Sequence, residues 1–380
     1  MDLGLTAEQQ QLRQSVRELS EREIRPQVMR WDEAQSWPAE ALAPLAAMGC
    51  MGMLVPAEYD GAGLGYIEYT LALEELARVD PSVALIVEAH NSLCTNHILV
   101  AGNEAQKRRY LPRLASGEWI GSWSLTEPGA GSDAGGARTR AERRDGGWVL
   151  QGAKTFTTNG AHAQVCVVMA VTQPERGKHG ISAFIVERGT PGFSNGRKEN
   201  KLGMRASDTS EMLFDNCRLP AEALLGKEGE GFVDALRILD GGRIGIAALA
   251  VGLAQGAYET ARNYARQRKQ FGKTLAEFQA IQWKLADMAT EIEAARLLTW
   301  RAAWQMDSGV TATLAAAMAK LKAGEVAVHA AGECVQIHGG YGFVKDYPAE
   351  KYYRDARLCT IGEGTSEIQR ILIAREVLKQ

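Results

Sequence analysis

One carboxylate lies between two glycines near the C-terminal end of this 380-residue chain, in the run Ile361-Gly362-Glu363-Gly364-Thr365-Ser366. Because glycine allows a close approach to the backbone, a ligand could lie against the Gly364 N–H while the Glu363 carboxylate points at it. Such a pair suits removal of a proton beside a carbonyl group, since the carboxylate takes the proton and the N–H stabilises the developing oxyanion. The same residues also suit an ordinary helix N-terminus with an acidic first turn, so this run alone leaves both interpretations open.

Two other segments carry residues suited to binding a cofactor. The run Ser122–Asp133 starts with β-forming residues and ends as a glycine-rich loop, with hydroxyls at Thr126 and Ser132. Backbone amides in such a loop can bind a pyrophosphate or the edge of a ring. The run Lys154–Gly160 places Phe156 beside several hydroxyls. A plain β-turn and an aromatic that packs across strands are the structural alternatives for these two segments.

The patterns of several functional classes are missing. The run Gly61–Gly65 is followed by Tyr66 where a dinucleotide fingerprint has its last glycine, and neither a P-loop nor a G-x-S-x-G motif occurs. A net charge of −3 and the lack of a basic tract argue against nucleic-acid binding. The six histidines lack the spacing of metal ligands, so we expect no metal site.

The sequence also bears on the compartment. No apolar run reaches the roughly 18–20 residues that a membrane span requires, and the run Met1–Gly4 lacks the layout of a signal peptide. Six cysteines are scattered without a C-x-x-C pair, which indicates reduced, mostly buried thiols. We therefore expect a cytoplasmic protein.

Hydrophobic periodicity divides the chain into helical, β and helical regions. Residues 1–118 read as helices, with a capping box at Thr6–Gln9, a helix that opens at Asp80 and runs towards Val100, and another that opens at Asn103 and ends near Pro112. Turn signals every eight to twelve residues then predict a β-barrel or sandwich. Long apolar stripes predict a four-helix-bundle-like region, with helices at Phe232 to Arg268, Phe278 to Met306 and Thr311 to Ile337. The expected class is α+β, with domains at 1–118, 119–228 and 229–380.

Seven blocks of the sequence resemble the acyl-CoA dehydrogenase family of flavoenzymes, in the family's order and over essentially the whole chain. The blocks are LTEPGAGSD (125–133), KTFTTNG (154–160), KLGMRASDTSEMLFDNCRLP (201–220), LDGGRIGIA (239–247), RQRKQFGKTLAEFQAIQWKLADM (266–288), QIHGGYGF (336–343) and EGTSEIQR (363–370). One block could arise by chance, but seven in order make coincidence implausible. The resemblance implies FAD as cofactor, an acyl-CoA substrate of fatty-acid β-oxidation, an electron-transferring flavoprotein as partner, and a homotetramer.

The resemblance also implies roles for particular residues. The flavin ring and pyrophosphate would be held by Leu125, Thr126 and Ser132, with Phe156 beside the isoalloxazine and Thr158 near its N5. Contacts to the FAD of an adjacent subunit are implied for Arg268, Gln270, Phe271, Gln336, Gly339 and Gly340, and contacts near the adenosine half for Thr365 and Glu367. Substrate contacts are implied for Gly364, Ser132, Asp240 and Arg243, the last two near the CoA part.

Members of the family differ in where they carry the catalytic base. In some, including isovaleryl-CoA dehydrogenases, the glutamate comes just before the arginine of the LD-x-x-R segment, where this chain has Gly242. The other position, ahead of G-T-S, is filled by Glu363. The resemblance therefore assigns the base to Glu363, which would remove the α-proton of a saturated acyl-CoA while hydride passes to flavin N5. The product would be a trans-2-enoyl-CoA.

Two positions depart from the family's common pattern, and the substrate stays open. Gly362 stands where the family often has Tyr or Thr, and Phe156 where it often has Trp. LDGGRIGIA resembles the short-chain branch, which favours a short acyl chain without excluding medium or branched ones. Residues 84–100 are expected to line the acyl pocket. A flavin oxidase of the same fold, a dehydrogenase of acyl groups on a carrier protein, and a non-catalytic scaffold are the alternatives.

Overall fold

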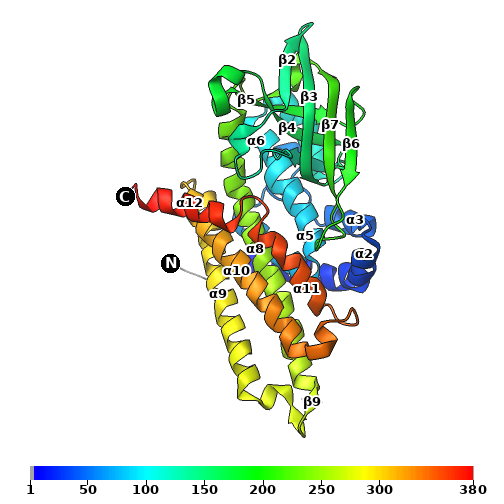
Figure 1. Ribbon diagram of the computed structural model, residues 1–380, viewed down its shortest axis with the longest axis vertical. Coiled ribbons are helices and arrows are strands. Elements are labelled where there is room, and N and C mark those ends of the chain that lie inside the picture. Colours follow the sequence, from blue (N-terminus) through cyan, green and yellow to red (C-terminus); the bar gives the residue numbers. More distant parts are fainter. Residues whose placement is uncertain (1–3, 380) are drawn as a thin grey trace.

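The computed structural model describes residues 4–379 and shows helical, β and helical regions in that order along the chain (Figure 1). This order confirms the α+β class predicted from the sequence. The first three residues, which belong to the run without a signal-peptide layout, lie outside the described residues.

Seven α-helices form the N-terminal region. They are α1 (Ala7–Leu19), α2 (Val28–Ala34), α3 (Ala39–Ala47), α4 (Tyr66–Val79), α5 (Pro81–Glu88), α6 (Asn96–Ala101) and α7 (Glu104–Ala115). The predicted capping box is present, because the Gln9 N–H donates to Thr6 Oγ1 (3.2 Å) and the Thr6 N–H donates to Gln9 Oε1 (3.0 Å). The predicted end of α7 near Pro112 is wrong: the helix continues to Ala115, because the buried Leu111 and Leu114 hold its last turn in the core.

The helix expected from Asp80 towards Val100 is present, but its middle is wider than an α-helix. Asp80 caps α5 by accepting from the Ser82 N–H (3.0 Å), and a π-helical segment, η4 (Ala89–Thr95), separates α5 from α6. His90, which lies in η4, accepts a hydrogen bond through Nδ1 from the N–H of Gly121 (2.9 Å). This segment is therefore fastened to the first strand of the β region. Such π-helical turns are frequent at functional sites.

The β region is one eight-stranded sheet that folds over on itself. Its strands are β1 (Gly121–Ser124), β2 (Arg140–Arg144), β3 (Gly147–Thr158), β4 (Val165–Val171), β5 (Ile181–Glu187), β6 (Phe193–Lys198), β7 (Thr209–Leu219) and β8 (Leu224–Leu225). The order is β6-β7-β3-β2-β4-β5-β8, and β1 runs parallel to β4. Trp148 on β3 meets Phe184 on β5 edge to face (5.1 Å between ring centroids), so the two halves of the sheet pack face to face as the predicted sandwich.

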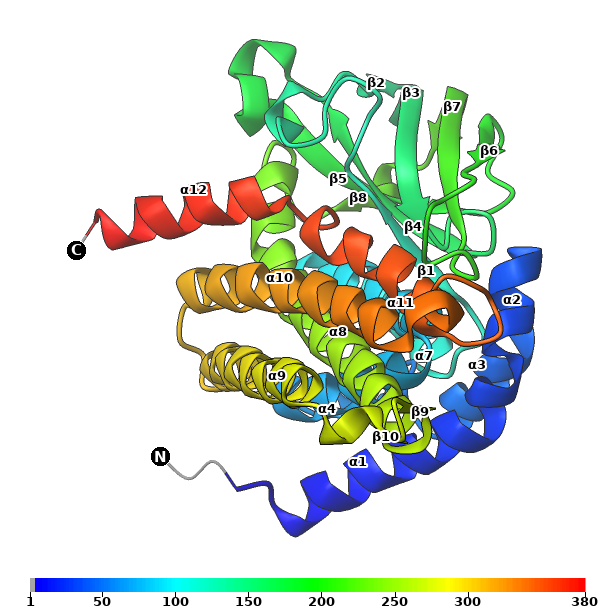
Figure 2. The ribbon, with the colours of Figure 1, turned by 60° about the horizontal axis from the view of Figure 1, so that its bottom comes forward.

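The C-terminal region is a helical bundle. It contains α8 (Gly231–Gln267), the hairpin strands β9 (Lys269–Gln270) and β10 (Lys273–Thr274), and then α9 (Gln279–Asp307), α10 (Thr313–His338), α11 (Ala349–Ala356) and α12 (Ser366–Val377). Helices α8, α9 and α10 pack lengthwise with α4 from the N-terminal region as the fourth member, whereas α12 extends away from them (Figure 2). The bundle-like prediction is confirmed, and one of its helices, α4, comes from the N-terminal region of the chain.

Three further properties concern residues 4–379. No helix in this range is long and apolar enough to cross a bilayer. All six cysteines are buried and none forms a disulfide. Across the same range, no group of three or more His, Cys, Asp or Glu side chains is arranged to hold a metal ion.

Candidate active site

The loop that carries Glu363 joins a 3₁₀ turn, η10 (Arg357–Thr360), to α12. Glu363 has φ 54° and Gly364 has φ 100°, so two consecutive residues adopt left-handed backbone conformations. For a residue with a side chain this conformation costs about 1–3 kcal/mol, and it persists only where the surroundings hold it. Thr365 then caps α12 by accepting from the Ile368 N–H (3.3 Å). The segment is a helix start, and it also turns the Glu363 side chain inward.

The Glu363 carboxyl lies against α8 at Gly242. A Cβ on Gly242 would come within 2.0 Å of Glu363 Oε2, so only glycine at this position leaves room for the carboxyl. Burial raises the pKa of Glu363 from 4.5 to about 7, while Glu88, Lys320 and Arg243 act in the opposite direction. A carboxyl group with such a pKa suits a general base near neutral pH.

A second buried carboxyl, that of Glu88 at the end of α5, lies within hydrogen-bonding reach of Glu363. Ser92 Oγ donates to Glu88 Oε1 (2.5 Å). Burial, together with the neighbouring Glu363 carboxyl, raises the pKa of Glu88 well above its ordinary value. Two carboxyls this close in a low dielectric do not both ionise, so Glu88 keeps its proton and Glu363 takes the charge.

The sequence interpretation missed Glu88. The signal that could have found it is that Glu88 is the single charged residue in the run Pro81–Ala89, whose other residues are apolar apart from Ser82. A carboxyl there is either exposed on the helix or buried as a titratable group, and the second case marks a functional-site candidate.

Asp240 and Arg243, both predicted near the substrate, contact each other on α8. Arg243 Nη1 donates to Asp240 Oδ1 (2.5 Å), and Thr313 Oγ1 donates to Asp240 Oδ2 (2.5 Å). Arg243 is buried and lies close enough to Glu363 to lower its pKa. The structure therefore places Arg243 near the Glu363 carboxyl. Both carboxylate oxygens of Asp240 accept hydrogen bonds, one from Arg243 on α8 and one from Thr313 on α10.

The residues predicted to hold the flavin gather where the loop after β1 meets β3. The Thr155 N–H donates to the Thr126 carbonyl (2.9 Å), and Lys154 Nζ donates to the Leu125 carbonyl (3.0 Å). Phe156 has φ 55° at a bulge in β3, and 63% of it is exposed. Its ring therefore points out of the sheet, which excludes the alternative of an aromatic packed across strands.

The same surface suits FAD. Gly129 and Gly131 have no heavy atom within 4 Å of where a Cβ would lie, so their backbone is open to a ligand. Ser132 lies exposed on this loop, and Thr158 lies two residues beyond Phe156 on β3. An exposed aromatic beside accessible amides and hydroxyls matches a flat ring that carries a pyrophosphate.

The residues predicted to reach a neighbouring subunit's FAD also come together, but elsewhere. The Arg268 guanidinium lies over the Tyr341 ring (5.6 Å), so the β9–β10 hairpin lies beside the turn that contains Gly339 and Gly340. Phe271, at the hairpin tip, is 93% exposed. The hairpin lies at the end of the molecule opposite the sheet (Figure 1). In a single chain, these residues are therefore remote from Phe156.

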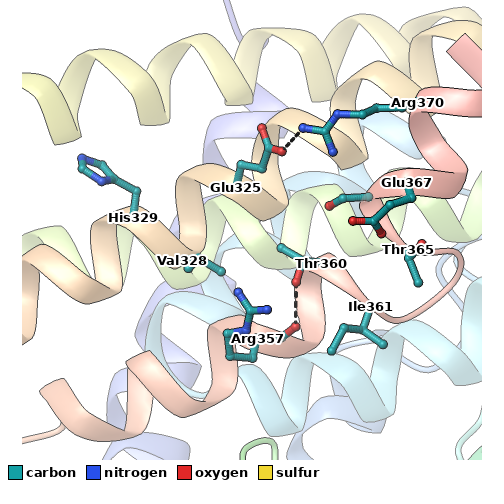
Figure 3. Close-up of a pocket in the computed structure, with 10 residues that line it drawn as sticks. Glu325, Val328, His329, Arg357, Thr360, Ile361, Thr365, Glu367 and Arg370 are labelled. Atoms are coloured by element: carbon teal, nitrogen blue, oxygen red, sulfur yellow. Dashed lines mark hydrogen bonds and ion pairs between the residues drawn. The ribbon is translucent and has the colours of Figure 1, made fainter. Parts of the chain in front are cut away.

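Thr365 and Glu367, predicted near the adenosine half, line a surface groove of about 520 Å³ between α10, η10 and α12 (Figure 3). Arg357 and Arg370 also line it, and Arg370 pairs with Glu325 across it. The groove carries mixed charge, since Glu325 and Glu367 line it as well as the two arginines, and the N-terminus of α12 that opens beside it is the feature that suits a phosphate.

The helical–β–helical fold, with a buried carboxyl of raised pKa in one loop and an exposed aromatic beside open backbone amides on the sheet, fits the class of flavin-dependent dehydrogenases. Comparison with known proteins agrees. Models of the acyl-CoA dehydrogenase N-terminal, middle and C-terminal domains match residues 6–118, 122–217 and 229–378. The short-chain-specific acyl-CoA dehydrogenase of Clostridium acetobutylicum is 46% identical over 379 residues, which cover 100% of each chain.

Solved structures extend the likeness. Butyryl-CoA dehydrogenase from Megasphaera elsdenii has a TM-score of 0.98 and 43% identity, with 100% of each chain covered. A glutaryl-CoA dehydrogenase from Mycobacterium smegmatis in complex with FADH2 has a TM-score of 0.94 and 34% identity, with 99% of this chain and 96% of that chain covered. The chain belongs to the acyl-CoA dehydrogenase family. It is an oxidoreductase that acts on acyl-CoA with FAD, which confirms the predicted family, activity and cofactor.

Proposed function

We propose that this protein converts a short-chain saturated acyl-CoA to its trans-2-enoyl-CoA, with Glu363 as the catalytic base. The observation that carries the proposal is the buried Glu363 carboxyl, seated in the space left by Gly242, whose pKa burial raises to about 7. Some members of the family carry the base at the position of Gly242, where this chain has no carboxyl.

Glu363 takes the α-proton of the thioester. In its buried position the carboxylate lacks stabilisation by water, which makes it a stronger base than an exposed glutamate. Within residues 4–379 neither the Glu363 N–H nor the Gly364 N–H has a hydrogen-bond partner. We assign the thioester carbonyl to the Gly364 N–H, and a donor aimed at developing charge contributes about 3–4 kcal/mol.

Bound FAD would accept the hydride that leaves the β-carbon when the α-proton is removed. Leu125, Thr126, Ser132, Phe156 and Thr158 are the residues of this chain that we assign to the flavin and pyrophosphate. Their part is to bind and orient the ring.

The preference for a short acyl chain rests on what fills the space beside the base. One helical turn along α8 from Gly242, a Cβ on Gly245 would lie 2.8 Å from Glu88 Oε1 and 3.2 Å from Tyr69 Oη. Tyr69 Oη also donates to the Glu88 carbonyl (3.3 Å). Side chains from α4 and α5 therefore limit the depth available to an acyl chain. The named activities of the C. acetobutylicum and M. elsdenii proteins support the same preference.

The assembly and partners are further parts of the proposal. Because the hairpin around Phe271 can meet a flavin only in another copy, we propose a homotetramer in which Arg268, Gln270, Phe271, Gln336, Gly339 and Gly340 complete the neighbour's FAD site. We propose Thr365 and Glu367 for the adenosine half, an electron-transferring flavoprotein as electron acceptor, and a cytoplasmic location. We also keep the domain limits 1–118, 119–228 and 229–380.

Anaerobic bleaching of the flavin tests the proposal. Butyryl-CoA should bleach the flavin faster than octanoyl-, palmitoyl- or isovaleryl-CoA does. Glu363→Gln should keep FAD and bind butyryl-CoA but reduce the flavin on the order of 10²–10⁴-fold more slowly, since general base catalysis is lost. Glu18→Gln, an exposed change on α1, is the matched control. Normal bleaching by Glu363→Gln would refute the base assignment.

The relatives named for acyl-CoA dehydrogenase activity do not favour the two alternatives, a flavin oxidase and a carrier-protein dehydrogenase. Peroxide formation, measured against reduction of an electron-transferring flavoprotein, separates the oxidase from the dehydrogenase. Comparison of butyryl-CoA with a butyrylated carrier protein separates the two substrates.

A further inference from the structure

A buried lysine lies behind the loop that carries the base. Lys320, on α10, is 1% exposed, and its Nζ donates to the Gly364 carbonyl at 2.6 Å. Gly364 follows Glu363 directly in the chain, so this bond acts on the peptide next to the base. Lysine is seldom fully buried without a partner, and here the partner is a main-chain oxygen of the active-site loop.

A second donor acts on the same oxygen. Gln369, on α12 and fully buried, donates through Nε2 to the Gly364 carbonyl (2.9 Å) and to the Glu363 carbonyl (3.4 Å). Lys320 and Gln369 thus hold the peptide from two different helices. Glu363 needs such support because its left-handed backbone is otherwise unfavourable.

Lys320 also contributes charge. Glu88, Lys320 and Arg243 face the Glu363 carboxyl, and the Tyr69 hydroxyl lies near it as well. Lys320 itself is faced by Cys359, Glu363, Arg243 and Glu367. Burial lowers the pKa of Lys320 to about 8, so the ammonium form is present at neutral pH and lowers the pKa of Glu363.

We propose that Lys320 is a positioning residue for the base. Its ammonium group holds the Gly364 carbonyl so that Glu363 keeps its inward turn, and its positive charge favours the carboxylate form of Glu363. The inference rests on the proposed role of Glu363, but it concerns a residue that no sequence motif singles out.

Lys320→Met removes the bond and the charge together. The variant should retain FAD, lose at least roughly tenfold in the maximal rate of flavin reduction by butyryl-CoA, and show little change in KM. The acid limb of the pH–rate profile should move to higher pH, because without the ammonium group Glu363 holds its proton more tightly. A residue with only a structural role would not move this limb.

Two further variants separate the two effects. Lys320→Arg keeps the charge, so its acid limb should stay at the wild-type pH while its rate falls. Lys320→Gln keeps a donor without the charge, so its limb should move to higher pH. Lys322→Met is the matched control. Lys322 lies two residues after Lys320 on α10 and pairs with Glu291 on α9, away from the Glu363 loop.

The outcomes decide the proposal. If Lys320→Gln keeps both the wild-type rate and the wild-type acid limb, the proposal is overturned, whether or not Lys320→Met folds. Failure of the proposed function itself would appear differently, as flavin reduction that survives Glu363→Gln.

Discussion

The two halves of the candidate active site differ in how completely one chain builds them. Around Glu363, the side chains of Glu88, Arg243 and Lys320 are buried and all three lower the pKa of Glu363, and Lys320 also donates to the Gly364 carbonyl. The cofactor side is open by contrast: Phe156, near the end of β3, is 63% exposed and Phe271, at the tip of the β9–β10 hairpin, is 93% exposed. That hairpin lies at the end of the molecule opposite the sheet (Figure 1).

This difference follows from what each half must do. The pKa of a base depends on burial and on charges within a few ångströms, so a single chain has to set it by its own packing. A flat aromatic ring needs contact area, which two copies can supply to each other. We therefore expect changes in the base half to alter rate and pH dependence, and changes in the cofactor half to alter FAD retention.

Gly242→Ala should have the largest effect of the three changes below. The new Cβ would lie 2.0 Å from Glu363 Oε2 and 2.9 Å from Leu93 Cδ2, the ends of two side chains, so both should move while the helix remains. A displacement of about 1 Å can cost roughly 10²-fold in rate. Stopped-flow flavin reduction measures the loss, and the helical circular dichroism should be retained because alanine favours helices.

Gly332→Ala is the control for this change. A Cβ on Gly332, on α10, would meet only Tyr353 at an ordinary 3.7 Å. A wild-type rate of flavin reduction in the Gly242→Ala variant would show that Glu363 does not depend on the space beside Gly242.

Glu88→Leu should have a smaller effect and show it mainly in pH dependence. The protonated Glu88 lowers the pKa of Glu363, so its removal should raise that pKa. Because the carboxylate is the active form, the acid limb of the flavin-reduction rate should move to higher pH. Glu88→Gln, which keeps an N–H donor, should leave the limb nearer its wild-type position. An unmoved limb in Glu88→Leu would contradict the effect of protonated Glu88 on the pKa of Glu363.

Phe271→Ala should have the smallest effect and act on the other half. The side chain is exposed at the hairpin tip, so the fold of the single chain should not change. We expect a few-fold weaker retention of FAD, measured as flavin released on dilution, with an unaltered acid limb. Val310→Ala, an exposed position between α9 and α10, serves as the control. Unchanged FAD retention would argue against the shared cofactor site.

Much of the fold could be predicted from local patterns. The capping residues Thr6 and Asp80 mark real helix starts. The bounds predicted from the long apolar stripes lie within about two residues of the observed bounds of α8, α9 and α10. The end of α7 could not be predicted, because burial of Leu114 outweighs the break that Pro112 suggests. The π-helical turn η4 could not be predicted either, because His90 within it accepts a hydrogen bond from Gly121, which is distant in the sequence.

The sequence by itself determined the family, the cofactor and the identity of the candidate base. Those features are carried by short motifs, in which residue type and spacing along the chain are enough. Only the tertiary structure decided how the base is tuned. Glu88, Gly242, Lys320 and Glu363 come from three helices and a loop, and their effects on one another depend on distance and burial. Neither quantity can be read from positions along a chain.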